Sequence, residues 1–360
     1  MQSWEIKDPI HGYIEVTPTE RAVIDTPQFQ RLRRVKQLSA AHLTYPGAEH
    51  TRFQHSLGVM HISGEIARRL QDVELINQKD ANRIRLAGLL HDIGHGPFSH
   101  LFEEVLEKMD MDHEQMSTRI VRETEVGDVL KGHGFDAKEV GDLSIGHLDC
   151  NKPYINNIIA GQFSADVLDY LPRDSYFSGV EYGKVDFDRL VRSIGVVDDT
   201  LAVKDTALYV LESMVIARYM MFKAVYFHRS VRAAEVMLVR AMELADEELG
   251  ITGFKTADEY HQLDDNSVIS MLSSLKDSSS KESRTAYELT QGYLDRKLLK
   301  CAYETVVHRR DRLAVNVMAM ADIRENLAKD IADEAGVDRN TVIMDVQTAP
   351  SLPYAASQQQ

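Results

Sequence analysis

Apolar residues recur at three- and four-residue intervals along most of this 360-residue chain. The pattern is clearest in residues 59–70, 84–90, 210–249 and 315–335. Because this spacing places the apolar side chains on one face of an α-helix, it predicts helices that pack through those faces. Strand signals are confined to residues 12–17 near the start and residues 341–346 near the end. The sequence therefore predicts a mainly α fold, a helical bundle with a small α+β lobe at the C-terminus.

Composition divides the chain into three parts. Residues 1–300 carry most of the helical periodicity and are expected to form one all-α domain. Residues 301–347 combine a helical stretch with the second extended piece, which predicts the small α+β lobe. Residues 348–360 are rich in Pro, Ser and Gln and are expected to be disordered, because such segments bury too little apolar surface to fold. Within the first part, the polar stretch 273–283 predicts an exposed loop between two helices.

The formal net charge of −15 argues against a surface built to bind nucleic acid, because phosphate contacts need clustered Lys and Arg. It still allows a small anionic ligand in a locally basic pocket. No apolar run is long enough to cross a bilayer, and the N-terminus has no signal-peptide pattern. The two cysteines lack CxxC spacing and suit a reducing compartment. We therefore expect a cytoplasmic protein with neither a membrane nor a nucleic-acid partner.

The most informative motif is LAGLLHDIGHGPFSH, which spans residues 86–100. An apolar helical segment leads into His91 and Asp92. His95 follows one turn later, and His100 comes after a Gly-Pro stop. His91 and His95 are four residues apart and would share a helix face. Because ionisable groups at the end of an apolar helix are costly to bury unless they are paired or bind a metal, the motif predicts a metal site beside the helix end.

Two residues cannot saturate a divalent ion, so further ligands must come from other parts of the chain. The candidates are histidines upstream and aspartates downstream of the motif, namely His50, His55, His61, Asp166, Asp169 and Asp174. Nitrogen and oxygen donors without sulfur suit one divalent ion such as Mn, Fe, Mg, Zn or Ni. Spacing alone does not choose among the candidates, and any single one could equally be a surface or helix-capping residue.

The order H…HD…D, carried by RFQHSLG, HDIGHGPFSH and ADVLDYLPRDS, resembles the motif order of the HD superfamily. More narrowly, the chain resembles the deoxynucleoside triphosphate triphosphohydrolases related to the mammalian SAM-and-HD-domain enzyme, without its SAM domain. The resemblance begins at DPIHG (residues 8–12), passes through IDTPQFQRLRRVKQL (residues 24–38) and continues more weakly to about Glu304. It implies an HD-domain helical bundle and a phosphohydrolase activity that depends on one divalent metal ion.

Carried over residue by residue, the resemblance implies a role for each matching position. The metal ligands would be His55, His91, Asp92 and Asp166. Catalytic roles would fall to His95, His100, His113 and Glu114, with His100 best placed to protonate the leaving 5′-oxygen. Substrate binding would involve Gln37, Leu38, Arg52, Tyr170, Asp174, Arg218 and Tyr226. In this last set the two arginines would bind phosphate, and Leu38 would disfavour ribose.

The resemblance also implies a homo-oligomer, a dimer or tetramer, with GTP or dGTP bound between subunits as an activator. Asp25, Gln30 and Arg33 match the family's activator site, but the lysine expected near the N-terminus is Trp4 here. On one helix, Asp25 and Arg33 would lie on the same side about two turns apart. The alternative is that Asp25 only caps the helix that Pro27 begins, and that no activator is needed.

The implied reaction is the hydrolysis of a deoxynucleoside triphosphate to deoxynucleoside and inorganic triphosphate. However, the family's phosphate-binding lysine, one residue after the last metal ligand, is Val167 here. The loss of that contact leaves open another HD activity on nucleotides, such as a monophosphatase, a guanosine tetraphosphate hydrolase or a phosphodiesterase. A third hypothesis is a nucleotide-sensing regulator with little turnover, against which the intact set of metal ligands argues.

Overall fold

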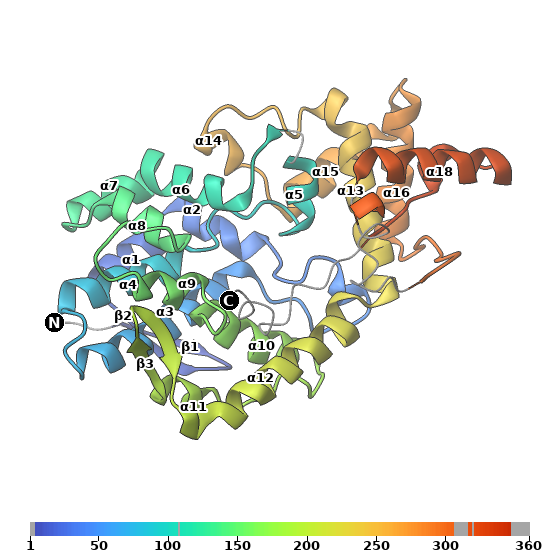
Figure 1. Cartoon of the computed structure of the whole chain (residues 1–360). Coiled ribbons are helices and arrows are strands. Elements are labelled where there is room, and N and C mark those ends of the chain that lie inside the picture. The colour runs from blue at the N-terminus through green and yellow to red at the C-terminus, as the bar shows by residue number, and fades with distance from the viewer. Residues whose placement is uncertain (1–3, 107–108, 306–315, 319, 347–360) are drawn as a thin grey trace.

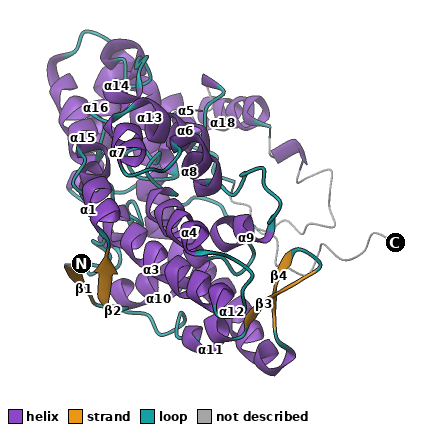
Figure 2. Ribbon diagram, turned by 90° about the vertical axis from the view of Figure 1, so that its left-hand side faces the viewer, coloured by secondary structure: helices purple, strands orange, loops and turns teal. Residues whose placement is uncertain are grey.

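The computed structural model describes residues 4–106, 109–305, 316–318 and 320–346. These residues form a mainly helical molecule with two small hairpins, which confirms the fold class expected from the periodicity (Figures 1 and 2). At its centre, α3 (Arg52–Gln71) packs against α4 (Gln78–Leu90). Helix α10 (Ala165–Ser178) packs on α3, and α8 (Ala137–Ser144) packs on α4.

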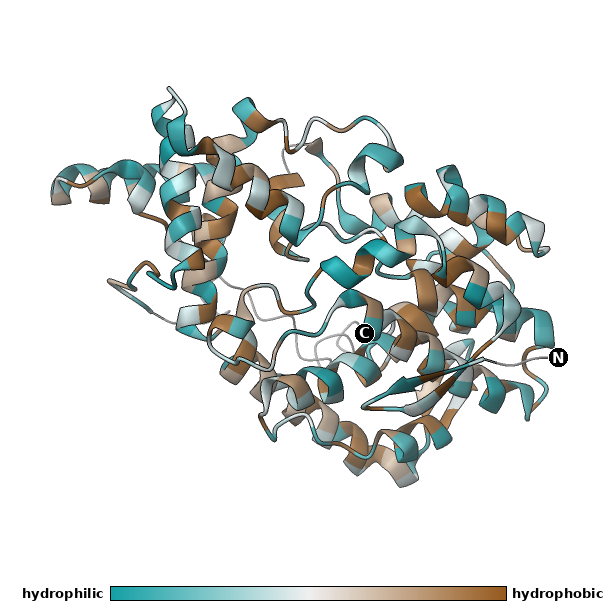
Figure 3. Cartoon of the chain, turned by 180° about the vertical axis from the view of Figure 1, so that it is seen from behind, coloured by the Kyte–Doolittle hydropathy of each residue, from teal (hydrophilic) through white to brown (hydrophobic). Residues whose placement is uncertain are grey.

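Two clusters of buried apolar residues hold the molecule together. The first joins the N-terminal hairpin to α1 (Pro18–Ile24), α2 (Pro27–Gln30), α5 (Leu101–Leu106), α6 (His113–Glu123), α7 (Glu125–Gly132), α13 (Arg229–Leu249), α14 (Ala257–Tyr260), α15 (Asp265–Ser273) and α16 (Lys281–Leu294). The second joins α9 (Tyr154–Ala160), α10, α11 (Phe187–Arg192), α12 (Leu208–Met221) and the second hairpin. Most helices carry both apolar and polar residues, as amphipathic helices do (Figure 3).

Helix α3 contributes to both clusters, which explains why so few of its residues are exposed. Phe53 and Met60 belong to the first cluster, while Val59 and Ile66 belong to the second. Helix α4 is shared in the same way. Because close-packed interiors resist displacement, the ends of these two helices are held in fixed positions relative to each other. Those ends carry the candidate functional residues.

The capping residues of α4 explain where the helix begins and ends. Asn77 caps its first turn, and Asp80 bonds back to the backbone of Asn77. At the other end the helix stops at Leu90, and the chain turns sharply through Gly94. A Cβ atom at Gly94 would lie 2.2 Å from the carbonyl oxygen of His113, so only glycine allows α6 to approach this turn.

The extended piece predicted at residues 12–17 is present as β2 (Gly12–Val16), which pairs antiparallel with β1 (Trp4–Asp8). A second hairpin, β3 (Ile194–Val197) and β4 (Thr200–Val203), was not predicted. Its turn residues Asp198 and Asp199 both have positive φ angles, of 48° and 55°. Asp-Asp is a weaker hairpin signal than Asn-Gly or Asp-Gly, which is why the short strands escaped notice.

The strand predicted at residues 341–346 is wrong. A 3₁₀ turn covers Arg339–Thr341, and residues 342–346 pair with no strand among the described residues. Instead these residues line a groove with α13 and α18 (Ala321–Ala335). An extended segment forms a strand only where a partner supplies backbone hydrogen bonds, and here residues of α13 and α18 lie beside it instead. The domain division at residue 300 stays a prediction, and residues 348–360 lie outside the described residues.

Two stretches of the chain have a secondary structure that differs from the one predicted. The predicted loop at 273–283 is mostly helical, because a 3₁₀ turn at Ser274–Asp277 buries Leu275 and α16 starts at Lys281. The helical stretch at 210–249 is broken by a π-helical turn, Phe222–Tyr226, between α12 and α13. Insertion of an extra residue into the turn redirects side chains, and such turns are frequent at functional sites.

Within the described part of the chain, none of the helices has both the length and the apolar character that crossing a membrane would require.

Candidate metal centre and active-site cavity

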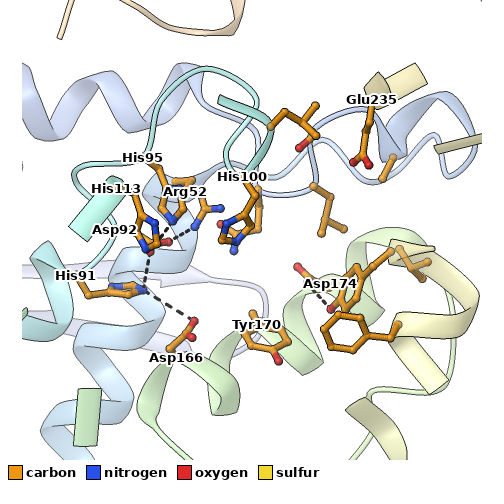
Figure 4. A pocket seen from close by; sticks show the side chains of 18 of the residues that line it. Arg52, His91, Asp92, His95, His100, His113, Asp166, Tyr170, Asp174 and Glu235 are labelled. Atoms are coloured by element: carbon orange, nitrogen blue, oxygen red, sulfur yellow. Dashed lines mark hydrogen bonds and ion pairs between the residues drawn. The ribbon is translucent and has the colours of Figure 1, made fainter. Parts of the chain in front are cut away.

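A cavity of about 580 Å³ lies where the end of α4, α6, α10, the π turn and α13 meet (Figure 4). All of the catalytic and substrate-binding residues predicted from the sequence line it. They are Gln37, Leu38, Arg52, His95, His100, His113, Glu114, Tyr170, Asp174, Arg218 and Tyr226. Its volume falls in the range typical of small-molecule sites. The fold therefore brings residues that are up to 189 positions apart into one cavity.

Four side chains converge at one end of the cavity, which we call the metal cluster: His55, His91, Asp92 and Asp166. The Nε2 atoms of His55 and His91 are 3.2 Å apart. His55 Nε2 lies 3.1 Å from Asp166 Oδ1, and His91 Nε2 lies 3.2 Å from Asp92 Oδ1. The four residues come from α3, the end of α4 and the first turn of α10. His55 is fully buried behind the other three.

The second ring nitrogen of each histidine is already occupied. His55 Nδ1 lies 2.7 Å from Asp169 Oδ2, and His91 Nδ1 lies 2.9 Å from the carbonyl oxygen of Gly88. Because Nδ1–H donates in each case, the lone pair of Nε2 is directed at the cluster. A hydrogen-bonded Nδ1 is the usual arrangement for a metal-binding histidine. Two imidazoles and two carboxylates, oriented in this way, fit one divalent ion.

The electrostatics of the cluster also favour a cation. Burial lowers the pKa of His55, but the carboxylates of Asp166 and Asp169 outweigh burial and raise it to about 10. Burial would raise the pKa of Asp92, yet the Arg52 guanidinium and His91 hold it well below the ordinary value. The Asp92 carboxylate is therefore ionised, and a bound cation would replace the proton that the carboxylates hold on His55.

A buried ion network lies behind His55. Asp169 accepts from Arg173 Nε and Nη2, both at 2.8 Å, and also contacts His11. Arg173 in turn donates to Asp8 at 2.9 Å. Asp169 was one of several candidate ligands in the sequence, whereas the roles of His11, Arg173 and Asp8 were missed. The Asp-x-x-x-Arg spacing on one helix was the available signal for the pair.

Three histidines gather around Glu103, a residue that the sequence reasoning missed. His100 Nδ1 and His113 Nδ1 lie 2.9 Å and 2.8 Å from Glu103 Oε1. His95 stacks on His113, with ring centroids 4.1 Å apart and planes inclined by 12°. The spacing of His100 and Glu103, three residues apart, was the available signal. The Glu103 carboxylate therefore hydrogen-bonds to His100 and forms an ion pair with His113.

The three histidines experience different surroundings. Burial, reinforced by the charge of Arg52, holds the pKa of His95 well below its ordinary value, so this ring is neutral at pH 7. Burial also lowers the pKa of His113, but the Glu103 carboxylate outweighs it and raises that pKa. The ring of His100 is the most exposed, at 69% of its side-chain surface. Only His100 therefore has free access to solvent.

Arg52 connects the metal cluster to the neighbouring loop. Its guanidinium forms a buried ion pair with Asp92, and its Nε donates to Ser99 Oγ at 2.8 Å. Ser99 and Phe98 both have positive φ angles, of 59° and 58°, directly before His100. Backbone conformations of this kind are costly and occur most often at functional sites.

Residues suited to a sugar lie at the other end of the cavity. Tyr226 donates its hydroxyl to Asp174 Oδ2 at 2.7 Å, and His50 Nε2 lies 2.8 Å from Asp174 Oδ1. His50 was a candidate metal ligand in the sequence, but the structure places it here, stacked on Phe177. Burial raises the pKa of Tyr170, so its phenol is protonated at neutral pH. The aromatic rings make this part of the cavity apolar. The buried carboxylate of Asp174 adds one strong hydrogen-bond acceptor.

The residues matched to an activator site lie away from this cavity. Asp25 is exposed and follows α1, so it does not share a helix with Arg33 as the sequence suggested. The alternative was also wrong in detail, because Thr26 rather than Asp25 caps α2. Arg33 donates to Gln30 Oε1 at 2.8 Å and stacks on the Phe53 ring. These residues form a surface group separate from the metal cluster.

Comparison with known proteins places the chain in a family. The model of the HD domain matches residues 52–170, which contain all four residues of the metal cluster, and the model of the HD associated region matches residues 185–360. The uncharacterized protein YwfO of Bacillus subtilis is 36% identical over 82% of this chain and 70% of its own length. The chain belongs to the HD-domain family. The HD match begins at the first residue of α3 and ends at Tyr170, inside the cavity.

Other relatives carry a named activity. The deoxynucleoside triphosphate triphosphohydrolase SAMHD1 homolog of Dictyostelium discoideum is 32% identical over 84% of this chain, and human SAMHD1 is 30% identical over 69% of it. The chain spans 60% and 45% of the length of these two proteins. Among solved structures, a hypothetical protein from Aquifex aeolicus superimposes with a TM-score of 0.74 and 35% identity, covering 88% of this chain and 82% of that one.

Proposed function

We propose that this protein hydrolyses deoxynucleoside triphosphates to deoxynucleoside and inorganic triphosphate. The observation that carries the proposal is the division of one cavity into two chemically different ends (Figure 4). One end, with the metal cluster and Arg52, is suited to bind phosphate groups. The other part, around Asp174, is suited to bind a sugar that lacks a 2′-hydroxyl. The HD-family match and the relatives named as triphosphohydrolases support a metal-dependent phosphohydrolase.

A divalent ion held by the metal cluster would polarise the phosphoryl group and make attacking water more acidic. The protein's own side chains do the remaining work. Arg218 lines the cavity and is available to neutralise phosphate oxygens. Arg52 lies at the metal cluster, where it is paired with Asp92, and we assign it to the α-phosphate. Such fixed charges stabilise the charge that develops in the transition state.

The bond changes place a proton donor near the sugar. As the water oxygen bonds to the α-phosphorus, the bond from phosphorus to O5′ breaks and O5′ keeps the electron pair. His100, oriented by Glu103, gives its proton to O5′, so that the nucleoside leaves as a neutral alcohol. The proton lost by the attacking water ends on solvent or on the triphosphate.

One observation favours a second candidate function. Val167 is buried in the second apolar cluster and does not line the cavity, so this position supplies no cation to the cavity where the family has a lysine. A substrate with fewer phosphates would need less positive charge. The alternative is therefore another HD phosphohydrolase activity on nucleotides, such as a monophosphatase.

A panel of nucleotides separates these possibilities. The protein is incubated with Mn²⁺ and each of the four dNTPs, dNMPs, rNTPs, cyclic nucleotides and guanosine tetraphosphate, and the products are separated by chromatography. Free triphosphate together with deoxynucleoside supports the proposal. Inorganic phosphate from dNMPs alone supports the monophosphatase, and turnover of none of them contradicts both.

Sugar selection provides the first specific prediction. Leu38 and Tyr170 line the cavity beside the acceptor Asp174, and we expect them to leave no room for a 2′-hydroxyl. The kcat/KM for dATP should exceed that for ATP by about 10- to 100-fold. Leu38→Ala should lower the ratio of kcat/KM for dATP to that for ATP, mainly by raising kcat/KM for ATP. Equal values in the wild type would remove the deoxyribose assignment.

The second prediction concerns the leaving group. His100→Ala should lower kcat by about 10²- to 10⁴-fold and leave metal binding unchanged, because general-acid help contributes this much. The exposed ring makes a folding defect unexpected, and the melting temperature provides the check. An unchanged kcat would move the role to His113.

Assembly and activation remain proposals that rest on the family resemblance. We propose a homo-oligomer, a dimer or tetramer, with a guanine nucleotide bound near Asp25, Gln30 and Arg33. Trp4 lies under the guanidinium of Arg21, at 4.4 Å, so its ring is not free to stack on a base without rearrangement. Weak activation by GTP is therefore expected. Sedimentation combined with a dATP hydrolysis assay, with and without GTP, tests this. A monomer whose rate ignores GTP would contradict it.

A further inference from the structure

Glu235 occupies the end of the cavity away from the metal cluster and is used by none of the steps above. It lies in the second turn of α13, and Figure 4 shows its carboxylate directed from that helix toward the cavity. Only 8% of the residue is exposed, so the carboxylate is largely removed from bulk water. A carboxylate in such a position is costly unless donors satisfy its oxygens.

The partners of Glu235 satisfy it only in part. Arg232 Nη1 donates to Glu235 Oε2 at 2.5 Å, but the same guanidinium also donates to both carboxylate oxygens of Asp345, at 3.0 Å and 2.8 Å. One cation thus serves two carboxylates. Oε1 of Glu235 has no hydrogen-bond donor within the part of the chain that the structure describes. Burial, opposed by Arg232, raises the pKa of this carboxyl to about 7, as expected for a group that lacks donors.

A ligand that brings N–H donors would complete this arrangement. With the phosphates at the metal cluster and the sugar beside Asp174, the base of a nucleotide reaches the end of the cavity where Glu235 lies. Guanine carries two adjacent donors, N1–H and the 2-amino group, which match the two oxygens of one carboxylate. Adenine and cytosine place a ring-nitrogen acceptor beside their amino group, and thymine has one N–H between two carbonyls. Hydrogen bonds to an ionised acceptor are about twice as strong as neutral ones.

We propose that Glu235 reads the base and makes guanine the preferred base at this site. The proposal rests on the proposed function, since it takes the nucleotide orientation from it. Arg232 positions the carboxylate, and Asp345 holds Arg232 from the C-terminal segment. Specificity for the base would thus depend on α13, in the HD-associated region, while the metal cluster belongs to the HD domain.

The test compares base preference in Glu235→Gln and the wild type. The amide replaces one acceptor by a donor that faces the donors of guanine, so the ratio of kcat/KM for dGTP to that for dTTP should fall about tenfold or more. Glu247→Gln, an exposed change on the same helix, is the matched control and should leave the ratio unchanged. An equal kcat/KM for dGTP and dTTP in the wild type, or an unaltered ratio in Glu235→Gln, overturns the proposal.

Two further measurements separate this inference from its premise. If no dNTP is hydrolysed, the proposed function fails, and equilibrium binding of dGTP and dTTP measured by calorimetry then decides the base question. A preference for dGTP that Glu235→Gln loses supports the inference, and equal affinities contradict it. If Glu235→Gln does not fold, Glu235→Asp replaces it, because aspartate retains the charge opposite Arg232 but is too short to reach the base. A retained dGTP preference in Glu235→Asp overturns the proposal.

Discussion

His91→Ala or Asp92→Ala should abolish hydrolysis, lowering kcat/KM by about 10³-fold or more. The reason is the convergence of two imidazoles and two carboxylates on one point, where removal of one ligand leaves an incomplete site. A metal ion contributes several kcal/mol to the stabilisation of transition-state charge, which corresponds to this loss of rate. Metal content measured by mass spectrometry should fall together with activity. In the wild type, added Mn²⁺ should raise the melting temperature, because a ligand that binds the folded state stabilises it.

The matched control is His147→Ala. His147 is exposed and lies outside the cavity, so its substitution removes an imidazole without touching the metal cluster. This variant should keep full activity and the Mn²⁺-dependent rise in melting temperature. If His91→Ala or Asp92→Ala instead retains full metal content and turnover, the metal site is assigned to the wrong residues.

The metal cluster shows what the sequence could and could not predict. The HD pair at the end of an apolar helix was visible because an apolar run seldom ends in adjacent ionisable groups. Its distant ligands were not visible, because His55 and Asp166 are separated from the pair by 36 and 74 residues, respectively. Four neighbouring candidates, His50, His61, Asp169 and Asp174, were equivalent by spacing. The choice of His55 and Asp166 came from the family resemblance, and the three-dimensional arrangement then placed both beside the pair.

His50 illustrates why sequence spacing alone cannot identify the metal-binding residues. It begins the same segment as His55, yet it points to Asp174 at the other end of the cavity. The side-chain direction depends on the start of α3 at Arg52, because His50 precedes the helix and His55 lies within it. Helix boundaries are the least predictable feature of a sequence pattern. A residue that precedes the helix does not follow helical spacing, so the direction of the His50 side chain cannot be inferred from its distance in sequence to His55.

The fold was predictable where the apolar periodicity extends over several helical turns. It was not predictable where contacts with distant parts of the chain determine the local structure. The helices of the core follow the apolar spacing, as α3 and α4 do. Residues 341–346 were predicted to form an extended piece but lie against α13, where Asp345 pairs with Arg232. Glu103 was missed although His100 lies only three residues before it, because its second imidazole, His113, approaches from α6. Local sequence does not encode such neighbours.

Asp169→Ala should lower the free energy of unfolding by about 3–5 kcal/mol, the largest effect on stability expected from any single substitution near the site. Asp169 is fully buried and pairs with Arg173 through two hydrogen bonds of 2.8 Å, while also contacting His55 and His11. Removing one partner of a buried ion pair leaves the other charge uncompensated, which costs this amount. Denaturant titration of the metal-free protein provides the measurement without a contribution from bound metal.

The same substitution has a predictable dependence on pH. Burial would raise the pKa of Asp169, but Arg173 holds it well below its ordinary value. The stability that Asp169 contributes is therefore complete above about pH 4, the ordinary value for aspartate, and is lost as the pH falls toward the depressed pKa of the folded state. The difference in stability between wild type and Asp169→Ala should accordingly shrink in acid. Glu181→Ala, which breaks an exposed pair with Lys184, should cost no more than about 1 kcal/mol. A loss of similar size in Asp169→Ala would mean that the buried network contributes little to the stability of the fold.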